Sequence, residues 1–147
     1  MTQNALSFDI VISGGGIAGL TAAAAFGKAG FSVLCVDPAP PITTRDADGA
    51  DLRSTAFLQP ARDFLNDIGL WSVLAPYATP LQTMRIVDAG DEVAEPRVTK
   101  DFDAADISEE PFGWNLPNWL LRREISAVLN DLSNVEACQT FQTHQTT

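Results

Sequence analysis

Near its start the chain reads Val11-Ile12-Ser13-Gly14-Gly15-Gly16-Ile17-Ala18-Gly19, and this stretch decides the fold. An apolar run at residues 8–12 leads into the glycines with the composition of a β-strand. An alanine-rich segment at residues 17–29 follows them with the composition of a helix, and a second apolar run at residues 31–36 ends at Asp37. This order of elements predicts a βαβ unit, and therefore an α/β fold with a parallel sheet.

The glycines follow the pattern G-x-G-x-x-G, in which each has a separate task. Gly14 makes the tight turn, Gly16 lets the backbone approach a pyrophosphate, and Gly19 lets the helix pack closely on the strand. The first N–H groups of the helix, including those of Ile17 and Ala18, favour negative charge together with the helix dipole. We therefore expect these five residues to bind the pyrophosphate of a dinucleotide.

Asp37 narrows the choice of dinucleotide that this unit is expected to bind. A carboxylate at the end of the second strand can accept hydrogen bonds from both ribose hydroxyls of an adenosine, and it repels a 2′-phosphate. This favours FAD or NAD over NADP. The alternative is that Asp37 and Pro38 only form the turn that ends the strand.

Composition and charge exclude several classes of partner. The 147 residues are 46% hydrophobic and carry a net charge of −10, which argues against binding to nucleic acid or to an anionic membrane surface. No apolar run approaches the roughly 20 residues of a membrane span, and the first strand begins too early for a cleavable signal peptide. With only Cys35 and Cys138 a disulfide framework is not expected, and the chain reads as cytoplasmic.

The rest of the chain predicts further elements. Apolar residues recur at helical spacing before Gly69, which is placed to end that helix: Phe57, Leu58, Ala61, Phe64, Leu65 and Ile68. Residues 81–88 alternate like a strand with Met84 and Ile86 on the buried side, and residues 98–102 form its partner. Residues 118–132 form an amphipathic helix. We expect no catalytic Ser/His/Asp set, no metal site, and no strand after Leu132.

Four segments together resemble the N-terminal part of the flavin-dependent aromatic hydroxylases, particularly the ubiquinone-biosynthesis hydroxylases. They are Gly14-Gly15-Gly16-Ile17-Ala18-Gly19, Asp51-Leu52-Arg53-Ser54-Thr55-Ala56, Ile68-Gly69-Leu70-Trp71 and Phe112-Gly113-Trp114-Asn115-Leu116-Pro117-Asn118. The resemblance implies an incomplete Rossmann-like FAD-binding domain at residues 1–80 and 114–138. Residues 81–113 would begin a β-rich substrate domain, and residues 139–147 would be a polar tail.

The resemblance also implies further cofactor residues. Arg53 occupies the position of an arginine that lies along the flavin and its phosphates; the alternative is a surface arginine. Asn118 occupies the position of a polar residue against the cofactor, or it caps the helix that follows. Arg122 or Arg123 would reach a phosphate, unless both are solvated.

By resemblance the activity is hydroxylation of an aromatic or phenolic ring by an FAD-dependent monooxygenase, with NAD(P)H as a transient reductant and O2. The substrate would be a small, polyprenylated phenol of ubiquinone biosynthesis, which implies a peripheral membrane or biosynthetic-complex association. Relatives are far longer, so we expect the chain to be a fragment that oligomerises through uncovered sheet edges. Two alternatives stay open: a non-catalytic nucleotide-binding remnant, and another flavoprotein oxidoreductase of the same fold.

Overall fold

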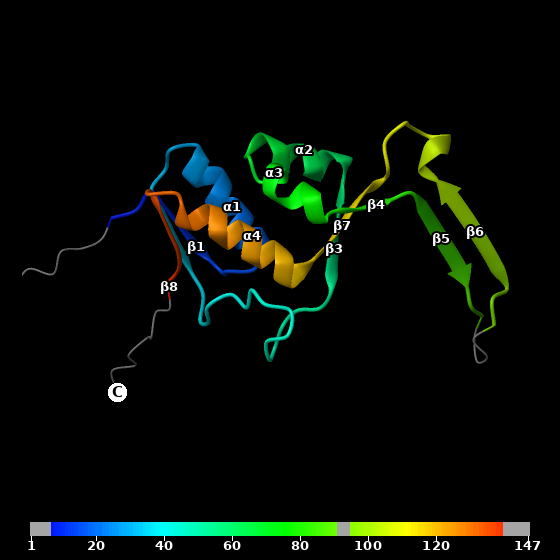
Figure 1. Ribbon diagram of the computed structural model, residues 1–147, viewed down its shortest axis with the longest axis horizontal. Helices are drawn as coiled ribbons and strands as arrows, with labels where there is room; N and C mark the ends of the chain where they lie inside the picture. Colours follow the sequence, from blue (N-terminus) through cyan, green and yellow to red (C-terminus); the bar gives the residue numbers. More distant parts are fainter. Residues whose placement is uncertain (1–6, 91–94, 140–147) are drawn as a thin grey trace, which may run out of the picture.

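The computed structural model describes residues 7–90 and 95–139. Its strands form a parallel three-stranded sheet, an antiparallel three-stranded sheet and a separate two-stranded hairpin. Helices α1 (Ile17–Lys28) and α4 (Asn118–Asn130) lie against the first sheet. Helices α2 (Gln59–Asp67) and α3 (Trp71–Leu74) lie beside the second, and the hairpin extends away from both sheets (Figure 1). The predicted α/β class is confirmed.

The first sheet is built on the expected βαβ unit. Strand β1 (Ile10–Ser13) and strand β2 (Val33–Val36) pair in parallel, with Ile10 opposite Val33 and Ser13 opposite Val36. Helix α1 (Ile17–Lys28) crosses over between them. Parallel strands need such a crossover, because a short turn cannot return the chain to the same end of the sheet.

A third strand, β8 (Val135–Gln139), pairs in parallel with the other edge of β2. The expectation that no strand follows Leu132 is therefore wrong, and the proposed tail begins inside this strand. The edge of β2 supplies the backbone partners for β8. Composition alone does not predict this strand, because that edge exists only in the folded chain. Residues 140–147 lie outside the described part of the chain.

The second sheet is antiparallel, and one of its strands contains residues whose spacing predicts a helix. Strand β7 (Gly113–Pro117) pairs with β3 (Ser54–Leu58) on one side and with β4 (Thr79–Leu81) on the other. Phe57 and Leu58 were expected in a helix, but they belong to β3. Helix α2 (Gln59–Asp67) begins only after them, with Pro60 in its first turn, where a missing N–H costs nothing.

Helix α2 ends at the position that the sequence predicts, just before Gly69. Gly69 adopts φ +78° directly after the helix, and its N–H donates to the carbonyl of Asn66 at 2.9 Å. The next N–H, of Leu70, donates to the carbonyl of Leu65, which completes a Schellman motif. Helix α3 (Trp71–Leu74) and the short 3₁₀ helix η1 (Ala75–Tyr77) then lead into β4.

The hairpin consists of β5 (Thr83–Asp88) and β6 (Val98–Asp103), followed by the 3₁₀ helix η2 (Ala104–Asp106). The expectation that Met84 and Ile86 are buried is wrong, because their side chains are 50% and 54% exposed. Within the described residues no further layer covers this hairpin (Figure 1). Alternation alone can mark the apolar face of a strand, but it cannot supply the layer that would bury it.

Helix α4 (Asn118–Asn130) completes the core between the two larger sheets. It packs on α1, α3, β7 and β8, and it buries Leu121, Ile125 and Leu129 completely. In the part of the chain that the structure describes, no helix has the length and apolar character needed to cross a membrane.

Leu121→Ala should destabilise the fold, because it leaves a cavity at a fully buried position. We expect a loss of about 2–5 kcal/mol in the free energy of unfolding, measured by denaturant titration. Leu52→Ala, at a side chain that is 67% exposed, is the matched control and should change little. Equal losses from the two substitutions would contradict this account of the core.

Candidate functional site

The glycine turn between β1 and α1 is held by backbone contacts. Gly14 adopts φ +113°, a left-handed conformation that favours glycine, and its N–H donates to the carbonyl of Val36 at 2.8 Å. A Cβ atom on Gly19 would overlap the carbonyl oxygen of Gly14. Gly14 and Gly19 therefore allow the helix to start directly against the turn.

Gly16 has no such structural reason to be a glycine. It is the N-cap residue of α1 with φ −74°, and a Cβ atom there would meet nothing within 4 Å among the described residues. No described side chain caps this helix end, so the first-turn N–H groups, including those of Ile17 and Ala18, have no capping acceptor among the described side chains. A Cβ on Gly16 would project into open space beside the start of the helix.

Asp37 closes this site from the end of β2. Its Oδ2 accepts the N–H of Gly15 at 2.7 Å, and its Oδ1 accepts the N–H of Ala39 at 3.0 Å. These two bonds, that of Ala39 first, lower the pKa of the carboxyl group from its ordinary value of 3.8, and the charge of Arg122 adds to the effect. The Ala39 bond forms the expected turn, but a carboxylate accepts about four hydrogen bonds, so capacity remains for a ligand.

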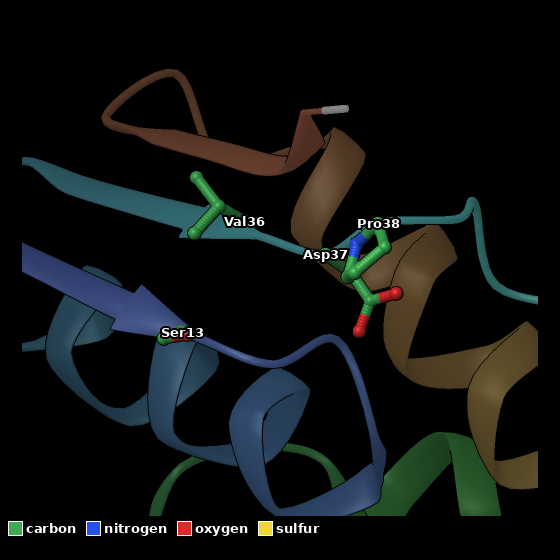
Figure 2. Close-up of a pocket in the computed structure, with 4 residues that line it drawn as sticks. All are labelled: Ser13, Val36, Asp37 and Pro38. Atoms are coloured by element: carbon green, nitrogen blue, oxygen red, sulfur yellow. The ribbon is translucent and has the colours of Figure 1, made fainter. Parts of the chain in front are cut away.

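Two adjoining pockets share Asp37. One, of about 180 Å³, is lined by Ser13, Val36, Asp37 and Pro38 (Figure 2). Figure 2 shows the carboxylate of Asp37 pointing toward the turn that joins β1 to α1. The second, of about 250 Å³, lies between the glycine turn, the loop after Asp37 and α4, and Gly16 and Arg122 are part of its wall.

Arg122 is the cation of the second pocket. Its Nε is buried and has no hydrogen-bond partner within residues 7–90 and 95–139. A buried N–H without an acceptor is costly, and a phosphate oxygen is a good acceptor for a guanidinium. Together, the uncapped helix start, the open space at Gly16 and this N–H fit the diphosphate of a dinucleotide.

Arg123 is occupied elsewhere. Its guanidinium pairs with Glu124 at 2.7 Å and lies over the rings of Tyr77 and Trp119 at 5.5 and 5.2 Å. Of the two adjacent arginines, the structure therefore brings only Arg122 to the glycine turn.

Arg53 and Asn118 lie in a separate cluster and do not line either pocket beside Asp37. The guanidinium of Arg53 is paired with both carboxylate oxygens of Asp51. The amide of Asn118 is buried, donating to Asp51 at 3.0 Å and accepting from the Thr55 hydroxyl at 2.7 Å. The N-cap of α4 is Pro117, with no side-chain cap among the described residues, so the capping alternative for Asn118 is wrong.

Asp51 is the residue that sequence reasoning missed. Its carboxylate joins Arg53 to Asn118, and hence the loop before β3 to the start of α4. The pKa of this carboxyl lies well below its ordinary range, chiefly because of its bond to Arg53 and then that of Asn118. The sequence held one signal: an aspartate two residues before an arginine.

Comparison with known proteins is consistent with this geometry. A family model described as an FAD binding domain matches residues 9–50, which include the glycine turn and Asp37. The chain is 32% identical over 124 residues to the ubiquinone hydroxylase UbiL of Rhodospirillum rubrum, covering 84% of this chain and 27% of that protein. The predicted resemblance to the flavin-dependent hydroxylases is confirmed.

Solved structures show the same fold. The p-nitrophenol 4-monooxygenase PnpA of Pseudomonas putida superimposes with a TM-score of 0.64 at 22% identity, over 87% of this chain and 30% of that one. The flavin-dependent monooxygenase PieE, solved with FAD and substrate, gives a TM-score of 0.67 at 23% identity, over 92% of this chain and 24% of that one. The chain thus spans about a quarter to a third of the length of these monooxygenases.

Gly19→Ala and Gly16→Ala should separate packing from ligand space. The first forces a Cβ into the Gly14 carbonyl, so we expect a loss of about 1–3 kcal/mol or more in the free energy of unfolding. The second meets no described atom at an ordinary φ and serves as the matched control, with a smaller loss of less than about 1 kcal/mol because alanine is a poorer N-cap than glycine. Thermal unfolding of both variants checks this; the reverse order would contradict the assignment.

Asp37 should contribute a pH-dependent part of the stability. Because its pKa is lower in the folded chain than in the unfolded one, the contribution is present above the ordinary value of 3.8 and is lost as the pH falls through the folded pKa. Asp37→Asn should therefore be less stable than the unaltered chain near neutral pH, and the difference should shrink below about pH 4. Unfolding free energies measured from pH 7 to 2 test this, and parallel curves would speak against it.

Proposed function

We propose that the described site holds FAD by its adenosine diphosphate half. The observation that carries the proposal is the pocket whose wall includes both Gly16, at the start of α1, and Arg122, whose Nε has no hydrogen-bond partner among the described residues. In the proposed complex the first-turn N–H groups and Arg122 would both contact the diphosphate, and Gly16 leaves room for it.

Asp37 sets the proposed preference among nucleotides. Its remaining lone pairs would accept the adenosine ribose hydroxyls, and its negative charge would repel a 2′-phosphate. Asp37 also lines the pocket formed by Ser13, Val36 and Pro38, and the adenosine would continue into that pocket. FAD or NADH is therefore favoured over NADPH at this site.

Arg53 and Asn118 are proposed to serve the flavin half. Their cluster lies outside the two pockets beside Asp37, and Arg53 is 84% exposed, so its guanidinium is available to a ligand at the surface. In this assignment residues 1–80 and 114–138 hold the cofactor, and residues 81–113 begin the part that receives the substrate.

We further propose that the chain is part of an enzyme that hydroxylates an aromatic ring, with FAD, NAD(P)H and O2. Support comes from the FAD binding model and from the similarity to a protein named ubiquinone hydroxylase. When bound, FAD would carry the redox chemistry, while this chain's residues bind and orient it. A phenolic, polyprenylated substrate, a peripheral membrane association and self-association belong to the same proposal.

Calorimetric titration with ADP, FAD and NADP tests the nucleotide site. The unaltered chain should bind ADP and FAD but bind NADP more weakly. Gly16→Val should abolish binding, and Arg122→Gln should weaken the binding of both ADP and FAD about tenfold or more, as expected for a lost charged hydrogen bond.

Arg123→Gln is the matched control, because Arg123 pairs with Glu124 outside the pocket, and it should leave the affinity for ADP unchanged. Binding that survives Gly16→Val would contradict the site. Binding of ADP with no gain for FAD would favour the non-catalytic nucleotide-binding alternative over a flavoprotein.

A further inference from the structure

Asp51, Arg53, Thr55 and Asn118 form a cluster that is held by more hydrogen bonds than an ordinary surface ion pair requires. Arg53 is 84% exposed on its side chain, yet two parallel hydrogen bonds of 2.9 Å fix it, from Nε to Oδ1 and from Nη2 to Oδ2 of Asp51. Asp51 itself is only 13% exposed. A long exposed arginine ordinarily samples many rotamers, and this fork restricts it to one orientation.

The carboxylate is held from its other side as well. Asn118 donates to Oδ2 at 3.0 Å, and the backbone N–H of Arg53 donates to Oδ1 at 3.2 Å. The Thr55 hydroxyl fixes the amide of Asn118, and the Asn118 N–H donates to the carbonyl of Arg53 at 2.8 Å. Asp51 is thus tied both to β3 and to the first turn of α4.

The fork also determines which part of the guanidinium faces outward. An arginine side chain has five N–H donors, and Asp51 takes two of them, so three remain. Asp51 also balances the charge of Arg53, so the pair offers directed hydrogen bonds more than net positive charge.

We propose that Asp51 is a positioning residue of the cofactor site, which presents the three remaining N–H groups of Arg53 to the flavin half of FAD. This inference rests on the proposed function, because it requires that the chain binds FAD. Asp51 acts through Arg53 and has no direct part in binding the ligand. Asn118 and Thr55 keep the carboxylate in place and tie it to the helix that carries Arg122.

A double-mutant cycle on FAD binding tests the proposal, with ADP binding as the internal reference. Asp51→Asn and Arg53→Gln should each weaken FAD binding about five- to tenfold and leave ADP binding unchanged. The double variant should bind FAD no more weakly than Arg53→Gln alone, since Asp51 acts only through that side chain.

The chain offers a matched control for this ion pair. Asp101 on β6 forms the same fork with Arg85 on β5, with bonds of 2.7 and 2.8 Å, in the hairpin away from the glycine turn. Asp101→Asn removes an equivalent carboxylate and should leave the affinities for both FAD and ADP unchanged.

Arg53→Lys keeps the test decisive even if Asp51→Asn fails to fold, because position 53 is exposed. Lysine retains the charge but cannot form the fork, so we expect it to lose as much FAD affinity as glutamine does. Full FAD affinity in Arg53→Lys would overturn the proposal.

Additive losses in the cycle, or equal losses of ADP and FAD affinity in Asp51→Asn, would assign Asp51 a structural role only and overturn this inference alone. Failure of the unaltered chain to bind either ADP or FAD would overturn the proposed function, and this inference with it.

Discussion

The close approach of helix α1 to the glycine turn is the constraint on which the rest of the site depends. Because Gly19 has no Cβ, the carbonyl oxygen of Gly14 can lie directly against the helix, and the left-handed Gly14 directs the chain back toward β2. The helix therefore begins at the carboxyl end of the sheet, where no described side chain caps its first N–H groups. Asp37, at the end of the neighbouring parallel strand, then closes the site by accepting the N–H of Gly15.

Charge is distributed unevenly around this site. The chain carries a net charge of −10, yet Arg122, whose buried Nε–H has no acceptor in the part of the chain that the structure describes, lines the pocket at the glycine turn. A helix start and one arginine can compensate a diphosphate locally in a protein that would otherwise repel it. At the second cluster Asp51 cancels the charge of Arg53 and orients it. The two arginines thus offer different kinds of contact: Arg122 is a half-buried cation, and Arg53 is a directed set of donors.

The sequence predicted the βαβ unit well, because its signals are local. The Gly14 turn, the alanine-rich helix and the strand that ends at Asp37 all lie where the pattern placed them, and Gly69 ends α2 as expected. The elements that the sequence pattern predicts wrongly depend on partners that are distant in the sequence. Phe57 and Leu58 have helical spacing, but β7 provides the hydrogen-bond partners that make them a strand. In the same way, β2 makes a strand of residues 135–139.

For the candidate site, the sequence by itself determined the glycine turn, the uncapped helix start and the carboxylate of Asp37, since one short segment contains them all. Only the tertiary structure decided between Arg122 and Arg123, because adjacent residues on a helix point in different directions and the packing of α4 against α1 selects which one faces the turn. It also decided the partners of Asn118, whose amide meets Thr55 and Asp51 only once β3 and β7 have paired. Local chemistry can be read from the order of residues, but contacts between distant segments exist only after the chain has folded.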